Sequence, residues 1–99
     1  MNLVESRVES VITISIEGRV DTNTSPDLQA AILKAFQKAN NLILNFEQCD
    51  YVSSAGLRAL LIGQKTANSK KGSMKLTQVQ PSVMSVFDMS GFSNMLTIE

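Results

Sequence analysis

Apolar and polar residues alternate most regularly between positions 11 and 17 of the chain. Ile12, Ile14 and Ile16 are each followed by a polar residue, and this period of two is typical of a strand with one buried face. A weaker alternation over residues 4–8 predicts an earlier strand. The two residues between these segments, 9–10, predict a hairpin turn that joins them.

Beyond this hairpin the pattern changes to helical periods and short apolar runs. We expect Gly18 to end the second strand and residues 19–25 to form a loop, because Asp, Asn, Thr and Ser favour turns. Ser25 is then the N-cap of a helix with Pro26 in its first turn. The remaining predicted elements are that helix over residues 26–39, a buried strand over 42–46, a helix from Ser54 to Lys70 or Lys71 with Gly72 as its stop, a strand over 74–79, a helix from Pro81 to Ser90 and a short strand over 95–98.

This order of elements predicts an α/β fold in a single small domain over residues 1–99. Strands that alternate with helices form parallel neighbours joined by crossovers, and the opening hairpin adds an antiparallel edge. We therefore expect a mixed β-sheet of four to five strands with about three helices.

Composition excludes several classes of function. Nine basic and nine acidic residues give zero formal net charge, so nothing favours binding to nucleic acid. The chain has no histidine and one cysteine, Cys49, which excludes a Ser-His-Asp triad, a Cys-His pair and a disulfide within the chain. No signal peptide and no apolar run long enough for a membrane span is present. We expect a cytoplasmic protein with no membrane association.

No residues in the sequence indicate a catalytic site, a cofactor or a metal. The glycine-rich phosphate loop of nucleotide-binding proteins is missing. Asp21, Asp50 and Asp88 allow a metal-binding carboxylate cluster, but roles in turns are the more frequent use of Asp. The composition therefore favours a binding module over an enzyme.

Two serines, Ser53 and Ser54, occupy the predicted start of the second helix. Serine at this position commonly caps a helix by accepting a hydrogen bond from a first-turn N–H. An exposed hydroxyl there also lies at the positive end of the helix dipole, which favours an added phosphate. Gly56 has no Cβ, so other atoms can approach closely beside Ser54. These residues by themselves do not decide between serines that only cap the helix and a serine that is phosphorylated.

Three segments resemble the bacterial anti-sigma factor antagonists of the STAS domain family, in family order. Residues 52–58 (VSSAGLR) resemble the phosphorylation-site motif, residues 17–21 (EGRVD) a Gly-x-x-Asp turn, and residues 87–92 (FDMSGF) a segment near the C-terminus. The family often has aspartate where this chain has Ser53. By alignment to Gly56 and Leu57, the resemblance implies that Ser54 is the phosphorylated residue.

The resemblance implies a regulator that switches partners. The unmodified protein would bind an anti-sigma factor that is also a serine kinase, using ATP and Mg²⁺, and a PP2C-type phosphatase would remove the phosphate. The family's fold implies helices mainly on one face of the sheet. The implied partner-binding residues are Asp21, Thr22, Asn23, Ser53, Ser54, Gly56, Leu57 and Arg58. The alternative is an accessory subunit without phosphorylation, such as those attached to transporters.

Overall fold

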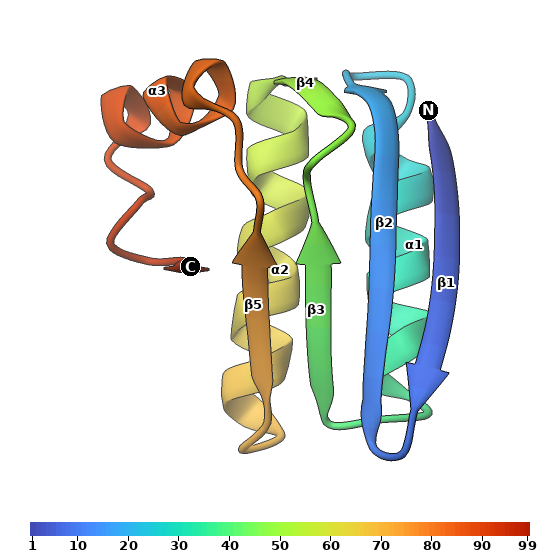
Figure 1. Cartoon of the computed structure of the whole chain (residues 1–99). Coiled ribbons are helices and arrows are strands. Elements are labelled where there is room, and N and C mark those ends of the chain that lie inside the picture. Colours follow the sequence, from blue (N-terminus) through green and yellow to red (C-terminus); the bar gives the residue numbers. More distant parts are fainter.

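The computed structural model describes all 99 residues as a mixed β-sheet with helices packed against it (Figure 1). The strands are ordered β1-β2-β3-β5-β6, and β4 pairs with the far half of β2. In chain order the elements are β1 (Asn2–Val8), β2 (Val11–Val20), α1 (Ser25–Phe36), β3 (Asn41–Asn45), β4 (Cys49–Val52), α2 (Ser54–Ser69), β5 (Ser73–Thr77), α3 (Pro81–Ser90) and β6 (Thr97–Ile98).

The predicted fold class is confirmed, with six strands in place of the four to five expected. Strands β1 and β2 are antiparallel, whereas every other pairing in the sheet is parallel. The helices α1 and α2 lie side by side on one face of the sheet (Figure 1). The third helix, α3, lies beyond the end of β5 and packs against β4.

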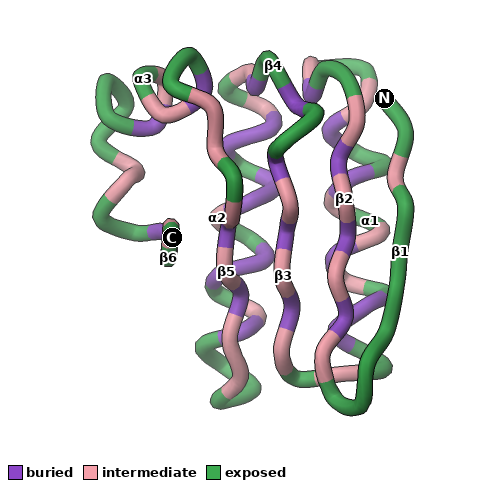
Figure 2. Tube along the Cα trace, viewed as in Figure 1, coloured by how far each residue is buried: buried purple, intermediate pink, exposed green.

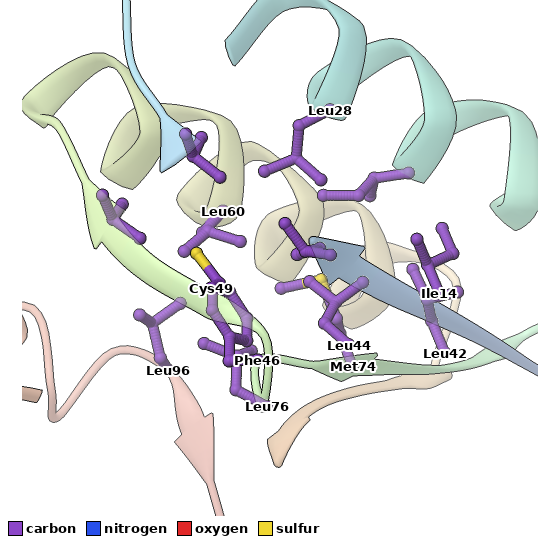
Figure 3. Packing of buried hydrophobic residues seen from close by; sticks show 14 of the residues in the cluster. Ile14, Leu28, Leu42, Leu44, Phe46, Cys49, Leu60, Met74, Leu76 and Leu96 are labelled. Atoms are coloured by element: carbon purple, nitrogen blue, oxygen red, sulfur yellow. The ribbon is translucent and has the colours of Figure 1, made fainter. Parts of the chain in front are cut away.

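The core lies between the sheet and the two long helices. Ile12, Ile14 and Ile16 are at most 1% exposed, so the alternation in the sequence does mark the buried face of β2. Figure 2 shows the same alternation of buried and intermediate residues along β3 and β5. Figure 3 shows how side chains from strands and helices meet in this core. At its upper end the rings of Phe46 and Phe87 meet edge to face, with centroids 6.3 Å apart, and this contact attaches α3.

The prediction that Gly18 ends the second strand is wrong. Strand β2 continues to Val20, and its register shifts between Gly18 and Arg19. Gly18 has φ of 100°, a conformation that a residue with a Cβ rarely adopts. The glycine therefore forms a bulge, which bends the strand and lets β2 change its neighbour from β3 to β4.

Strand β4 leaves no clear signal in the sequence. Only the two ends of its four residues, Cys49 and Val52, are buried, so neither strict alternation nor a continuous apolar run is present. The strand that leads into α2 is consequently β4, and not the apolar strand over residues 42–46. That apolar strand is β3, and a turn at Glu47 and Gln48 separates the two.

The helix ends differ from the predictions in detail. Helix α1 begins at Ser25, and its N-cap is Thr24 rather than Ser25. Helix α2 ends at Ser69, and Lys71, not Gly72, takes the left-handed conformation with φ of 58°. A Cβ on Gly72 would collide with the backbone oxygen of Asn40, so this glycine allows a close approach of two chain segments.

Candidate functional site

The two serines at the start of α2 have different roles in the structure. Ser53 is the N-cap, with extended backbone angles of φ −83° and ψ 174°, and its Oγ accepts a hydrogen bond of 3.2 Å from the Gly56 N–H. Ser54 is the first helical residue, and its side chain is exposed. Ser53 therefore caps the helix, whereas the Ser54 hydroxyl is free of that role and faces solvent.

Two residues implied as partner contacts, Gly56 and Leu57, lie inside the domain. Leu57 is 3% exposed and belongs to the core. A Cβ on Gly56 would lie 2.8 Å from a methyl group of Val20 and 2.9 Å from one of Val52, which is closer than packed atoms tolerate. In the free domain these two residues therefore pack inward, and whether they contact a partner stays a prediction. Because Gly56 has no Cβ, the side chains of Val20 and Val52 can pack directly against the start of the helix.

Asp21 organises the loop that precedes α1. Its Oδ1 accepts hydrogen bonds from the backbone N–H of Asn23 at 3.0 Å, from the Thr24 N–H at 2.9 Å and from the Thr24 hydroxyl at 3.1 Å. In return the Asp21 N–H donates to the Thr24 Oγ1 at 2.8 Å. The Thr24 backbone hydrogen bond is the largest cause that lowers the pKa of Asp21, and the charge of Arg19 adds to it. The carboxylate is thus held in its charged form.

Hydrogen bonds between strand ends bring the Asp21 loop and the serines together. The Ser53 N–H donates to the Val20 carbonyl at 2.8 Å, and Val20 pairs with Val52 in the β2–β4 ladder. Asp21 directly follows Val20, and Ser54 directly follows Ser53. The loop and the start of α2 therefore emerge next to each other at one end of the sheet, where β4 meets α2 in Figure 1.

Exposed side chains near these two segments complete the surface. Thr22, Asn23 and Arg58 are exposed, as the predicted contact surface requires. Sequence reasoning missed a further pair, because it depends on β4: Arg19 lies over the ring of Tyr51, 4.2 Å from the ring centroid. The two residues are directly paired across β2 and β4. Only the knowledge that these strands are neighbours could have indicated this contact.

This end of the sheet is an open surface. The two hollows on the domain, of about 350 and 280 Å³, lie elsewhere: one is lined by residues near the β1–β2 turn and the ends of α1 and α2, and the other by α2 and Met95. Nowhere do three His, Cys, Asp or Glu side chains gather to hold a metal ion. Cys49 is buried, and burial is the main cause that raises the pKa of its thiol. An exposed hydroxyl on an open surface suits recognition by another macromolecule.

One known family of domains matches nearly the whole chain. The family model for the STAS domain matches residues 3–99, so the chain belongs to the STAS domain family. None of its helices combines the length and apolar character that a membrane crossing requires.

Individual relatives and structures show the same likeness. The chain is 27% identical over 99 residues to BtrV of Bordetella bronchiseptica, covering 99% of this chain and 85% of that one. It is 28% identical over 90 residues to the anti-sigma F factor antagonist of Paenibacillus polymyxa, covering 89% of this chain and 77% of that one. The structure of the unphosphorylated anti-sigma factor antagonist SpoIIAA superposes with a TM-score of 0.83 at 24% identity, covering 99% and 88% of the two chains. At this identity the superposition shows the shared fold.

Proposed function

We propose that this protein is an anti-sigma factor antagonist controlled by phosphorylation of Ser54. The unmodified form binds an anti-sigma factor that is also a serine kinase, and this binding frees the sigma factor. The observation that carries the proposal is the exposed Ser54 hydroxyl at the first position of α2, beside a serine that is already used as the cap. Membership of the STAS domain family and the anti-sigma factor antagonist among the relatives support it.

Phosphorylation at this position changes charge without disturbing the fold. The kinase transfers the γ-phosphoryl group of its Mg²⁺-bound ATP to the Ser54 Oγ, with release of ADP and of the hydroxyl proton. The phosphate adds about −1.5 to −2 charges. A negative charge at a helix N-terminus is typically stabilising by about 0.3–1 kcal/mol, so the modified domain stays folded. A PP2C-type phosphatase restores the hydroxyl by hydrolysis.

The same phosphate would expel a docked partner. In the proposed complex Ser54 is covered by the kinase, and a phosphate there has to be desolvated without a matching cation. A hundredfold loss of affinity needs about 2.7 kcal/mol, which is within the penalty for an unpaired buried charge. The loop at Asp21, Thr22 and Asn23, together with Arg58, supplies the surrounding contacts in this proposal. The protein itself acts as a binding module in the cytoplasm and carries out no reaction.

The test uses the cognate kinase, ATP and Mg²⁺, with phosphosite mapping by mass spectrometry and affinity from calorimetric titration. We expect phosphate on Ser54 alone. Ser54→Ala should bind the kinase and resist modification, and Ser54→Asp should bind poorly while it keeps its melting temperature. Ser53→Ala is the matched control, because it removes the neighbouring hydroxyl and should still accept phosphate.

Two outcomes would contradict the proposal in different ways. Phosphate on Ser53 would refute the assignment of the acceptor but keep the switch. Phosphate on neither serine would remove the switch and favour an accessory subunit without phosphorylation.

A further inference from the structure

Strand β1 leaves one edge of the sheet open. It pairs with β2 alone and is the terminal strand of the sheet. All seven of its residues pair with β2 without a register shift, and none of them is proline. Figure 2 shows β1 exposed along almost its whole length. A long, regular edge with unpaired backbone groups is a template for another strand, and proteins usually protect such edges.

The side chains of β1 fall into two sets. Val4 and Val8 are 48% and 73% exposed and belong to the face of the sheet that the long helices leave uncovered. Glu5 and Arg7 point to the helix side, because they pair with the buried Ile14 and Ile12. On that side the Glu5 carboxylate forms an ion pair of 2.9 Å with Lys38 of α1.

These residues are arranged symmetrically about Ser6. Val4 and Val8 lie two positions to either side of Ser6, and Glu5 and Arg7 lie one position to either side. We propose that two copies of this chain pair through antiparallel β1 strands, about a twofold axis at Ser6. Each Glu5 then lies opposite the second copy's Arg7, and each exposed valine lies opposite a valine of the other copy. Opposite charges and β-branched pairs across strands are the stabilising combinations.

The hairpin supplies an independent check on which backbone groups are free. The β1–β2 turn has two residues, and Val8 and Val11 are its closing pair. In a hairpin of this kind the closing pair is hydrogen-bonded, and hydrogen-bonded pairs alternate along the strands. Val8, Ser6 and Val4 therefore direct their backbone groups to β2. Glu5 and Arg7 direct theirs outward, so they can form the hydrogen-bonded pairs of the new ladder.

The charges of the side chains and the direction of the backbone hydrogen-bonding groups together select one register. A shift by one residue would oppose an outward-facing residue to an inward-facing one and break the ladder. A shift by two residues would place Glu5 opposite a second Glu5, or Arg7 opposite a second Arg7, and like charges in that position are destabilising. Among the registers within two residues of each other, only the one centred on Ser6 satisfies both conditions, and it also pairs the whole of β1.

The paired form keeps both serine sites open. Ser54 is the first residue of α2. Helix α2 begins beside β4 at one end of the sheet, whereas the joined edge runs along β1 (Figure 1). A twofold axis between antiparallel strands turns the two copies so that their Ser54 ends face opposite directions. The dimer therefore does not depend on the proposed phosphorylation, and Ser54→Ala should leave it unchanged.

Sedimentation velocity over a wide range of concentration tests the charge pairing. We expect a concentration-dependent dimer for the natural sequence. Arg7→Glu should weaken dimerisation about tenfold, because the symmetry replaces two attractive pairs with two repulsive ones. Glu5→Arg should weaken it similarly, and the double variant Glu5→Arg/Arg7→Glu should restore it by exchanging the charges. Thermal melts of each variant verify that the monomer stays folded, since Glu5→Arg also removes the ion pair with Lys38.

A cross-link tests the axis itself. In the proposed register the two Ser6 residues are a directly opposed, non-hydrogen-bonded pair with Cα atoms about 4.5 Å apart, which lies within the range that a disulfide spans. Ser6→Cys treated with diamide should form a covalent dimer, as two thiols give up two hydrogens to diamide and form one S–S bond. Val8→Cys is the matched control, because it lies opposite Val4 and should cross-link at least about tenfold more slowly. Cys49 is buried and does not compete.

Three results would overturn the proposal. The first is a monomer at every concentration up to the millimolar range. The second is a dimer that is indifferent to Arg7→Glu, which would place the contact on another surface. The third is equal cross-linking of Ser6→Cys and Val8→Cys, which would show random collision rather than a fixed register.

Discussion

The most direct test of the structure at the serine site is the loss of the Ser53 cap. Ser53→Ala removes the oxygen that accepts a 3.2 Å hydrogen bond from the Gly56 N–H. Gly56 is itself buried against Val20 and Val52, so water cannot readily replace the lost acceptor. Loss of a serine cap costs about 0.5–2 kcal/mol, and an N–H left unpaired in a buried place costs about 1–3 kcal/mol.

We therefore expect Ser53→Ala to lower the free energy of unfolding by about 1–2 kcal/mol, toward the upper part of the capping range. For a domain of this size each kcal/mol corresponds to about 4–8 °C in Tm. Urea unfolding followed by circular dichroism measures the free energy, and calorimetry measures the Tm. An unchanged urea m-value would show that the loss is one of stability and not of compactness.

Two matched variants separate the cap from the loss of a hydroxyl. Ser53→Asp keeps an acceptor oxygen at the N-cap and adds a charge that the helix dipole favours, so stability should be retained or raised. Ser54→Ala removes an exposed hydroxyl that takes no part in the cap, and its stability should change by less than about 0.5 kcal/mol. The reasoning would be refuted if Ser53→Ala matched the natural protein, or if Ser54→Ala were the more damaging change.

Two further predictions concern Asp21 and Gln64. Because the folded state lowers the pKa of Asp21 below its ordinary value of 3.8, the stability it contributes is present above that pH and lost as pH falls through the folded pKa. Asp21→Asn keeps the Oδ1 acceptor but loses the charge, so the stability that it lacks relative to the natural protein should shrink on acidification. Asp21→Ala loses the acceptor as well and should be the less stable variant at neutral pH. Urea titrations at several pH values measure both, and a difference for Asp21→Asn that does not depend on pH would contradict the prediction. Gln64 is 8% exposed, and its Oε1 has no hydrogen-bond partner, so Gln64→Met should hold stability constant or raise it by up to about 1 kcal/mol in urea unfolding. The substitution also removes the hydrogen bond of 3.2 Å that the Gln64 Nε2 donates to the Asn68 Oδ1. A clear loss would mean that this bond, or bound water at the Oε1, contributes more than the burial of an unpaired oxygen costs.

Local patterns in the sequence determined most of the elements. Three alternating isoleucines fixed the buried face of β2, because a strand has a period of two and its sheet has helices on one face only. The third helix runs from Pro81 to Ser90, as predicted, and Gly91 ends it in the left-handed conformation. Proline at a helix start and glycine after its end act through backbone angles alone. Such signals need no knowledge of the rest of the fold.

Strand β4 and the bulge at Gly18 could be decided only by the tertiary structure. A glycine after an alternating strand can either end the strand or form a bulge within it. Which of the two occurs depends on whether another strand is available to pair with the residues after the glycine. Residues 49–52 become a strand because β2 offers them a free edge past the bulge. The two paired segments are about thirty residues apart in the chain, and neither has a hydrophobic periodicity that would indicate the pairing.

At the serine site, too, some features follow from the sequence and others depend on the tertiary structure. The sequence placed two hydroxyls at a helix start, because serine there satisfies a first-turn N–H. The residues alone allowed either serine to cap, and only the resemblance assigned Ser54 as the acceptor. The cap depends on the backbone angles that the β4–α2 junction imposes on Ser53. The resemblance implied Gly56 and Leu57 as partner contacts, whereas the structure buries both in the domain. Their burial against Val20 and Val52 follows from the pairing of β2 with β4, which brings distant residues together beneath the start of the helix.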